Sequence, residues 1–335
     1  MLFQKSGLKI LFFAALAIVA ALPVHAQDTD DVIRTETSLV QLNIGVVDKQ
    51  GRPITSLTRN DFAVYEDGVK QSIQHFESVD APFSLVLMLD MSGSTVNFRQ
   101  QLKLASQRFL DALAPEDRVA VIQFNKNVKS LSGFSTDRSK TAYAIEIANG
   151  AGETHFYEAL KYALRELEKE GQRRKAIVVL TDGLDTNLRN TDRTTLSKVQ
   201  TDEEALATIQ PHSSTDLNNV LTSADRLGVT IYPLALPSGD PKRLPLQTPN
   251  ILGIYAAARA RLQSLADRTG GRLNEINRLE YMAQLYREVA ANLRTLYTVA
   301  YQAKGDRARG KWHEIKVEVA NTDLTARTKP GYYAR

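Results

Sequence analysis

The sequence predicts an α/β protein, in which a doubly wound, mainly parallel sheet is inserted in a small β-sandwich. Continuous apolar runs such as 85–89 and 177–180 are typical of strands that are buried on both faces of a parallel sheet. These runs alternate with amphipathic helical stretches, which is the pattern of an α/β fold. Shorter segments near both ends of the chain alternate apolar with polar residues, as half-buried strands do.

The two ends of the chain carry incomplete sets of strands. The strands that we expect there are 40–46, 61–66, 69–76, 296–302, 313–319 and 324–327. Asp67-Gly68, between two of them, is a strong two-residue hairpin signal. Neither set has enough strands to be stable alone. We therefore expect an N-terminal β segment over 27–79 to pair with a C-terminal β segment over 296–335 in one β-sandwich.

The body between these segments, residues 80–295, shows strands and helices in alternation. We expect strands at 85–89, 119–124, 128–134, 177–180, 229–236 and 272–276, the third of them at an edge. We expect helices at 98–112, near 139, from 156 to 167, and at 216–227, 255–269 and 279–293. Two connections, 186–213 and 237–254, are longer than a compact α/β domain needs. Both are either tolerated surface insertions or loops that shape a binding surface.

Three oxygen-bearing side chains follow the apolar run 85–89. We expect Asp90, Ser92 and Ser94 on the loop at the carboxyl end of this strand, where open α/β sheets bind ligands. A set of oxygen ligands without nitrogen or sulfur suits a hard divalent cation such as Mg²⁺. On their own, an aspartate and two serines could instead cap the following helix. The rest of the chain has to decide between these two interpretations.

Two further loops supply the same kind of side chain. Thr154 precedes the amphipathic stretch 156–167. Asp182, followed by Gly183, ends the run 177–180. With these residues the chain resembles the von Willebrand factor type A (VWFA) domain and its metal-ion-dependent adhesion site (MIDAS). That motif is an Asp-x-Ser-x-Ser, a distant threonine and an aspartate that is usually followed by glycine. Its five positions are matched, in order, by Asp90, Ser92, Ser94, Thr154 and Asp182.

The resemblance implies a Rossmann-like fold and a bound divalent ion, Mg²⁺ or alternatively Mn²⁺ or Ca²⁺. Two carboxylates balance the charge of such an ion, and three hydroxyls complete five positions around it. Because Mg²⁺ prefers six oxygens, one position is left for an outside ligand. In VWFA domains this ligand is typically an Asp or Glu carboxylate of a partner protein.

The segments outside the metal motif resemble a bacterial group, the VWFA-related domain proteins described from Acidobacteria. The resemblance rests on residues 61–68, which read Asp-Phe-Ala-Val-Tyr-Glu-Asp-Gly, and on Gly331-Tyr332 near the C-terminus. It covers nearly all of the chain after residue 26. It implies the fold and metal binding, but no partner and no activity.

Residues 1–26 have the pattern of a secretory signal peptide. Lys5 and Lys9 precede an apolar core over 10–22, and Ala26 ends a small-residue cleavage pattern. An uncleaved membrane anchor is disfavoured because this apolar stretch is only about 13 residues long, against the roughly 20 that a spanning helix needs. No later segment is apolar enough to cross a membrane. We expect a secreted protein, periplasmic or extracellular, and the absence of cysteine excludes disulfides and a lipid-modified N-terminus.

The composition and the sequence motifs argue against several other functional classes of protein. Cleavage removes two lysines, which lowers the net charge from +4 to +2 and argues against nucleic acid as a partner. The chain has no Gly-x-Ser-x-Gly, His-Glu-x-x-His or Gly-x-Gly-x-x-Gly sequence, so the common hydrolase, zinc-protease and dinucleotide-binding signatures are absent. Of the histidines after residue 26, His155 alone adjoins a metal loop.

We therefore expect a metal-dependent adhesion or interaction module and not an enzyme. One alternative is a metal-dependent hydrolase of phosphate or ester substrates, with His155 as the base. Another is a structural envelope component in which the β-sandwich mediates assembly and the ion only stabilises the loops. Metal-stimulated turnover would identify the first alternative. Chelation that lowers the melting temperature without affecting partner binding would identify the second.

Overall fold

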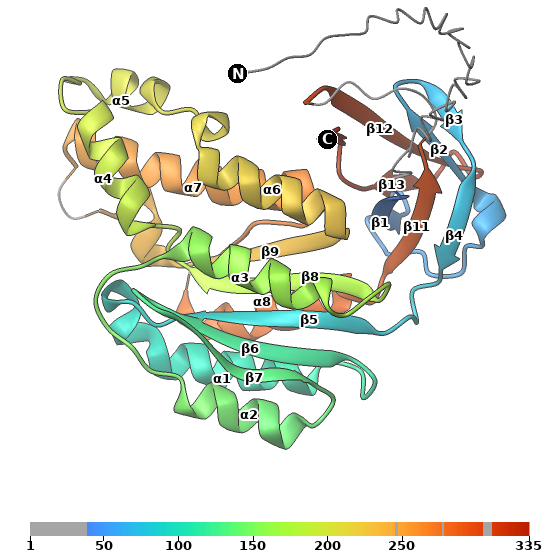
Figure 1. The fold of residues 1–335 in the computed structure, drawn as a ribbon, viewed down its shortest axis with the longest axis horizontal. Coiled ribbons are helices and arrows are strands. Elements are labelled where there is room, and N and C mark those ends of the chain that lie inside the picture. Colours follow the sequence, from blue (N-terminus) through green and yellow to red (C-terminus); the bar gives the residue numbers. More distant parts are fainter. Residues whose placement is uncertain (1–38, 245–246, 277, 304–309, 335) are drawn as a thin grey trace, which may run out of the picture. The chain divides into compact units, whose positions relative to one another are not determined.

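The computed structural model describes residues 39–334 except 245–246, 277 and 304–309. The predicted signal peptide, residues 1–26, lies outside the described residues. The described part contains a six-stranded sheet between helices, and two four-stranded antiparallel sheets from the two ends of the chain (Figure 1). The predicted fold class, an α/β sheet accompanied by a β-sandwich, is confirmed.

The central sheet has the strand order β10-β9-β8-β5-β6-β7. Its strands are β5 (Phe83–Asp90), β6 (Arg118–Phe124), β7 (Val128–Ser135), β8 (Arg174–Thr181), β9 (Val229–Ala235) and β10 (Asn274–Glu275). All neighbouring strands are parallel except β6 and β7, so β7 is an antiparallel edge strand. Every residue of β5 and β8 is buried, which explains their continuous apolar runs.

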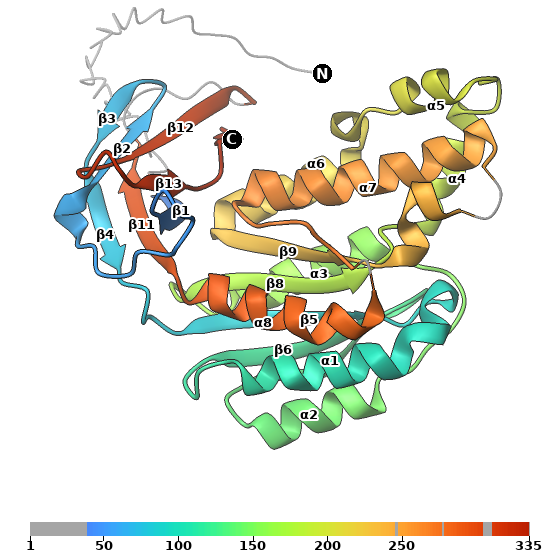
Figure 2. The ribbon, with the colours of Figure 1, turned by 180° about the vertical axis from the view of Figure 1, so that it is seen from behind.

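Helices cover both faces of this sheet. They are α1 (Arg99–Asp111), α2 (Arg138–Ile147), α3 (Phe156–Glu168), α6 (Thr215–Leu227), α7 (Pro249–Thr269) and α8 (Met282–Leu293), the last preceded by a 3-10 turn, η6 (Leu279–Tyr281). Leu85 and Leu87 of β5 belong to a core with α1 and α8, whereas Val86 and Met88 belong to a core with α3 and α6. The two faces are seen in turn in Figure 1, with α3 in front, and Figure 2, with α8 in front. Within the described ranges, no helix combines the length and the apolar character needed to cross a bilayer.

The strand order reverses between β5 and β8. From β5 the chain continues to β6 on one side, and later places β8 on the other side. In open α/β sheets, ligands bind at the carboxyl ends of the strands at such a point. Leu89 of β5 and Leu180 of β8 form the last pair of this ladder, so Asp90 and Thr181 follow it on neighbouring strands.

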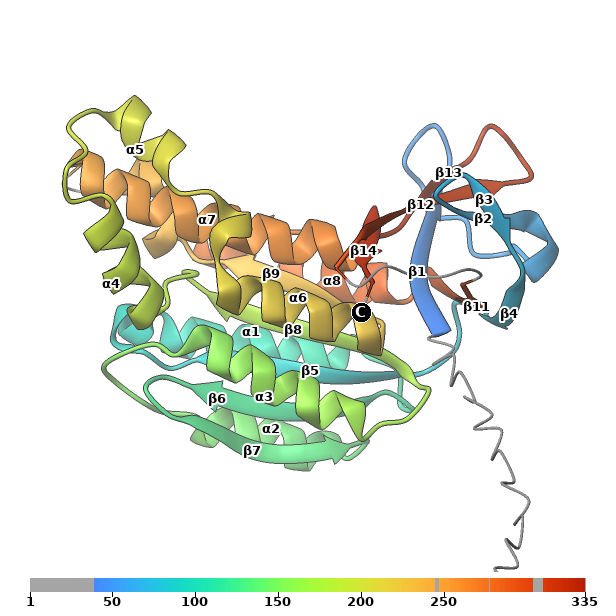
Figure 3. The ribbon, with the colours of Figure 1, turned by 45° about the horizontal axis from the view of Figure 1, so that its top comes forward.

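The polar composition of the connection 186–213 suggests an irregular loop. In the structure, however, the connection is mostly helical. It forms α4 (Thr186–Thr195), α5 (Asp202–Thr208) and a 3-10 turn, η3 (Pro211–Ser213). Asp185 and Thr201 cap the two helices by accepting backbone N–H groups. Leu196 and Ala205 pack into a small core with α7. Figure 3 shows α4 and α5 beside the first turns of α7.

The second long connection is also more ordered than its four prolines suggest. It contains two 3-10 turns, η4 (Pro237–Gly239) and η5 (Pro241–Arg243). Helix α7 then begins at Pro249, six residues before the expected start at Tyr255. Thr248 is its N-cap and accepts the N–H of Ile251, and proline is well tolerated in a first helical turn because its missing N–H has no partner there.

The two terminal sheets have the orders β13-β1-β11-β4 and β14-β12-β2-β3. Their strands are β1 (Leu39–Val47), β2 (Phe62–Glu66), β3 (Val69–Gln71), β4 (Ile73–Glu77), β11 (Leu296–Gln302), β12 (Trp312–Val319), β13 (Thr325–Arg327) and β14 (Gly331–Tyr333), with a 3-10 turn, η1 (Arg59–Asp61), before β2. β1 pairs with β11 and β2 with β12, and buried side chains from both ends of the chain share one core. The domain limits 27–79, 80–295 and 296–335 stay a prediction.

The hairpin between β2 and β3 turns at Asp67-Gly68. Both residues have positive φ angles, 49° and 78°, as a two-residue turn of type I′ requires. Polar side chains beside this turn join the two ends of the chain. Tyr301 Oη donates to Glu66 Oε2 at 2.6 Å, and His313 Nδ1 lies 2.8 Å from Asp67 Oδ2.

Arg174, the first residue of β8, is fully buried and joins the two crossings between the central sheet and the terminal strands. Its Nη1 donates to the carbonyl oxygens of Val79 and Ala81, both at 3.0 Å. Its Nη2 donates to those of Leu293 and Leu296, at 2.9 and 2.7 Å. One guanidinium therefore holds both the segment that enters β5 and the segment that leaves α8.

Candidate metal centre

The first loop of the candidate site follows β5. Asp90 and Ser92 are fully buried, and Asp90 Oδ1 accepts a hydrogen bond from the backbone N–H of Ser92 at 3.0 Å. The hydroxyls of Ser92 and Ser94 lie 3.1 Å apart. Ser92 is the N-cap of a 3-10 turn, η2 (Gly93–Phe98), but its side chain makes no capping hydrogen bond. The capping interpretation of this residue therefore lacks support.

The second loop follows β8, the neighbour of β5. Asp182 is buried, and its Oδ1 accepts the N–H of Leu184 at 3.1 Å. The nearby Ser94 hydroxyl favours the charged form of the Asp182 carboxylate and so lowers its pKa. Asp182 Oδ2 is buried and has no hydrogen-bond partner among the described residues. A buried carboxylate oxygen without a hydrogen-bond donor is energetically unfavourable, so this atom is a candidate ligand for a cation.

The third loop carries Thr154, which is held by its backbone between the other two loops. Its N–H donates to Thr186 Oγ1 at 3.0 Å, and its carbonyl oxygen accepts the N–H of Thr186 at 2.9 Å. Two residues earlier, the Gly152 carbonyl oxygen accepts the N–H of Gly93 at 2.9 Å. The structure thus brings all three predicted loops together. It joins Asp90, Ser92 and Ser94 through their polar groups, and Asp182 follows directly after Thr181, whose hydroxyl is hydrogen-bonded to Asp90.

Two glycines allow the chain to close around Asp182. Gly183 has a φ of 85°, and a Cβ there would lie 2.7 Å from Leu262 Cδ1 of α7. A Cβ at Gly239 would lie 2.1 Å from the carbonyl oxygen of Asp182. A side chain at either position would therefore push α7 or the turn η4 away from this loop.

The two carboxylates perturb one another because both are buried. Burial raises the pKa of Asp90 to about 7, and repulsion from the Asp182 carboxylate adds to this effect. Burial likewise raises the pKa of Asp182, while the Ser94 hydroxyl and the backbone N–H of Leu184 act in the opposite direction. A divalent cation between the two groups would favour the charged form of both carboxylates and so offset both shifts, which means that the donor set fits such an ion.

The chemistry of the donor set narrows the kind of metal. In the part of the chain that the structure describes, no group of three or more His, Cys, Asp and Glu side chains could hold a metal ion. The candidate site has only two such side chains, Asp90 and Asp182, and it depends on hydroxyl oxygens for the rest. Oxygen donors without imidazole or thiolate suit Mg²⁺, Mn²⁺ or Ca²⁺.

Two residues that hold the loops were not predicted. Thr181 Oγ1 donates to Asp90 Oδ2 at 2.7 Å. Arg99, at the start of α1, donates from Nη2 to the Ser92 carbonyl oxygen at 3.2 Å and from Nη1 to Asn149 Oδ1 at 3.0 Å. A hydroxyl directly before Asp182 is a signal that the sequence offers for the first of them, and nothing in the sequence points to the arginine.

His155 occupies the N-cap position of α3 without a side-chain capping bond. Its backbone N–H donates to the carbonyl oxygen of Asn125 at 2.9 Å, and its Nε2 lies 3.9 Å from Glu153 Oε2. Within the described residues, no hydrogen bond joins its ring to the five predicted ligands. This position favours a structural role or a contact with a partner.

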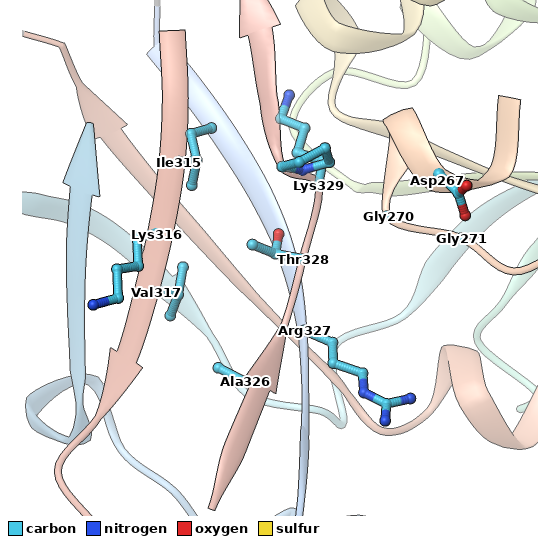
Figure 4. A pocket seen from close by; sticks show the side chains of 11 residues that line it. Asp267, Gly270, Gly271, Ile315, Lys316, Val317, Ala326, Arg327, Thr328 and Lys329 are labelled. Atoms are coloured by element: carbon cyan, nitrogen blue, oxygen red, sulfur yellow. The ribbon is translucent and has the colours of Figure 1, made fainter. Parts of the chain in front are cut away.

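A groove of about 490 Å³ lies away from these loops, between the end of α7 and strands β12 and β13. Figure 4 shows that the side chains of Lys316 and Arg327 point to opposite sides of it. Lys329 is buried and lies 3.3 Å from Asp225. Because these charges do not converge, the groove does not form an anion site.

Residues 85–184 match the family model of the von Willebrand factor type A domain. The matched segment runs from β5 to the loop after β8 and includes all five predicted ligands.

Solved structures to which this chain is similar include two from bacteria and one from a mussel. The vWF domain of the type V pili tip protein Mfa5 from Porphyromonas gingivalis has 14% identity and a TM-score of 0.48, over 68% of this chain and 98% of that one. A von Willebrand factor type A protein from Catenulispora acidiphila has 12% identity and a TM-score of 0.47, over 90% and 75% of the two chains. Proximal thread matrix protein 1 from the mussel byssus, with a zinc-occupied MIDAS motif, has 14% identity and a TM-score of 0.46, over 68% and 49%.

Proposed function

We propose, from the match of residues 85–184 to the model of the von Willebrand factor type A domain, that the protein is a secreted interaction module that binds a divalent cation and, through it, a carboxylate of a partner protein. Domains of this family act generally in interaction and adhesion. The cation, its ligands and the chemistry of the partner are the finer part of the proposal.

The observation that carries the proposal is the pair of buried carboxylates, Asp90 and Asp182, at the ends of neighbouring strands. Two negative charges that are buried close together are unfavourable unless a cation neutralises them. The positive charge of Arg259 lowers the pKa of Asp182. However, Nη2 of Arg259 donates its hydrogen bond to the Leu236 carbonyl oxygen and not to the Asp182 carboxylate. A divalent ion would neutralise both carboxylates.

In this proposal each predicted ligand has a distinct part. Asp90 and Asp182 supply the negative charge, and Ser92, Ser94 and Thr154 supply neutral oxygens. Mg²⁺ is the expected ion, with Mn²⁺ and Ca²⁺ as alternatives, since all three accept oxygen donors. The bound ion supplies a point of positive charge to which an Asp or Glu side chain of a partner coordinates.

The test is calorimetric titration of Mg²⁺ and Mn²⁺ into the metal-stripped mature chain, from Gln27 to Arg335. We expect one ion to bind to the wild-type protein and none to bind to Asp90→Ala or Asp182→Asn. The matched control is Asp216→Asn, which removes a half-exposed carboxylate that pairs with Lys161 at 2.7 Å. A folded wild-type protein that binds neither ion, or an Asp182→Asn variant that binds as well as the control, would contradict the proposal.

Two other outcomes separate the proposal from its alternatives. Metal-stimulated hydrolysis of a phosphate or ester that disappears in His155→Ala would identify a hydrolase, although the position of His155 does not favour one. Chelation that lowers the melting temperature but leaves partner binding unchanged would identify a structural component. Export from the cytoplasm, with cleavage after Ala26, is part of the same proposal and is tested by N-terminal sequencing of the exported chain.

A further inference from the structure

The register between β5 and β8 places a hydroxyl beside the first carboxylate of the site. Leu89 pairs with Leu180, so the next residues along the two strands, Asp90 and Thr181, also stand opposite one another. Opposite residues of parallel strands have their side chains on the same face of the sheet. Thr181 is fully buried and its Oγ1 lies 2.7 Å from Asp90 Oδ2.

The hydroxyl of Thr181 takes part in two hydrogen bonds, and together they fix its direction. It accepts the backbone N–H of Gly183 at 3.1 Å and donates its single proton to Asp90 Oδ2. Gly183 has the positive φ of 85° that this tight turn requires. The chain of donors therefore runs from the loop of Asp182 to the carboxylate of Asp90.

Both oxygens of the Asp90 carboxylate are held as a result. Oδ1 accepts the N–H of Ser92 from its own loop, and Oδ2 accepts the hydroxyl of Thr181 from the neighbouring strand. The first bond fixes the carboxylate relative to the loop that follows β5. The second bond fixes it relative to β8 and thus to Asp182.

We propose that Thr181 is a positioning residue for the metal site, which orients the Asp90 carboxylate and keeps it in register with Asp182. This inference rests on the proposed function, because it requires that a divalent ion binds there. Partners in the outer shell of metal ligands contribute about 10- to 100-fold to affinity, because an oriented ligand needs no reorganisation when the ion arrives.

The test compares Thr181→Val, which keeps the shape and removes the hydroxyl, with Thr181→Ser, which keeps the hydroxyl. The probes are Mg²⁺ and Mn²⁺, titrated calorimetrically into the metal-stripped mature chain. We expect the dissociation constant to rise about 10- to 100-fold in Thr181→Val and to stay within about threefold of wild type in Thr181→Ser.

The matched control is Thr298→Val, in β11. Thr298 is also buried, and its hydroxyl also donates to a side-chain oxygen, Asn43 Oδ1, at 2.9 Å. Both valine variants lose a buried hydrogen bond and should melt at lower temperatures without metal. Only Thr181→Val should lose metal affinity, which a purely structural role would not produce.

Each outcome bears on the inference in a defined way. Equal metal affinity in wild type and Thr181→Val would overturn the positioning role while leaving the proposed function in place. No metal binding by the wild-type protein would overturn both. If Thr181→Val does not fold, Thr181→Cys takes its place, since a thiol is a weak donor. It must then bind metal more weakly than Thr181→Ser for the inference to hold.

Discussion

Asp90 and Asp182 lie at the ends of neighbouring strands, and both carboxylates are buried. At the scale of single residues, this arrangement makes the metal-free site sensitive to protons. Folding raises the pKa of Asp90 from its ordinary value of 3.8 to about 7, because burial and the nearby Asp182 disfavour the charged form. The folded protein therefore binds a proton at Asp90 more tightly than the unfolded chain does.

This linkage predicts how pH changes the effect of metal. The stabilising contribution of protonated Asp90 is fully present below pH 3.8 and is lost as the pH rises through about 7. A cation replaces the proton at high pH, whereas the two compete at low pH. We expect Mg²⁺ to raise the melting temperature more at pH 8 than at pH 5.5. Melting temperatures measured with Mg²⁺ and with EDTA between pH 5.5 and pH 8 test this expectation.

Asp182→Asn is the control for the pH experiment, because a chain without the site should show no effect of Mg²⁺ at either pH. An Mg²⁺-induced shift that is equal at pH 5.5 and pH 8 in the wild-type protein would show that protons and the ion do not share Asp90.

The candidate ligands could be predicted from the sequence because Asp90, Ser92 and Ser94 lie two residues apart and because the order of all five side chains along the chain is distinctive. The role of Thr181 could not be predicted in the same way. It depends on which residue of β8 stands opposite Asp90, and the two residues are 91 positions apart. A shift of one residue in that register would place Asp182 opposite Asp90, so strand pairing determines whether a hydroxyl or a second charge meets the carboxylate.

At the scale of elements, the sequence predicted the core strands and helices well, but not α4 and α5. Their apolar residues are few, and they are buried against α7, a contact between segments that are distant in the sequence. A buried ion pair completes this contact. Nη1 and Nη2 of Arg261 in α7 donate to the Asp192 carboxylate of α4, each at 2.7 Å, and both side chains are 6% exposed.

Removal of one partner of this pair should loosen α4. Arg261→Met leaves the Asp192 carboxylate buried without its cation, and we expect a loss of about 3–5 kcal/mol in the free energy of unfolding. The double variant Arg261→Met/Asp192→Leu should recover most of that loss, since no unpaired charge remains. Urea denaturation measures both.

An exposed ion pair serves as the control for this prediction. Arg226 pairs with Glu168 between α6 and α3, and both side chains are more than two-fifths exposed, at 43% and 46%. Arg226→Met should therefore change stability by less than about 1 kcal/mol. An Arg261→Met variant that is no less stable than this control would mean that water reaches Asp192 and that α4 is not anchored by the pair.

At the scale of the whole molecule, both ends of the chain are needed for the terminal sheets, because β1 pairs with β11 and β2 with β12. The sequence could predict this pairing, since neither set of strands is complete alone. It could not predict how the two crossings are fixed. Arg174 does this with its guanidinium, which also lies 4.0 Å from the centre of the Phe83 ring.

We expect Arg174→Met to lower the free energy of unfolding by at least about 3 kcal/mol. The carbonyl oxygens to which Arg174 donates in the wild type would stay in the interior without a donor. The loss should also expose the crossings near Ala81 and near Leu296 to limited proteolysis before the central sheet unfolds. Urea denaturation and mapping of the first cleavage sites check the two parts of this prediction.

Arg174→Lys separates the shape of this side chain from its charge. Lysine keeps the positive charge but has three donors on one nitrogen, so it cannot reach the carbonyl oxygens of both crossings as a planar guanidinium does. It should therefore be nearly as unstable as Arg174→Met, whereas Arg165→Met, at an exposed position of α3, should resemble the wild type. A fully stable Arg174→Lys would mean that a positive charge at this position is enough to hold the crossings, and that the planar guanidinium is not required.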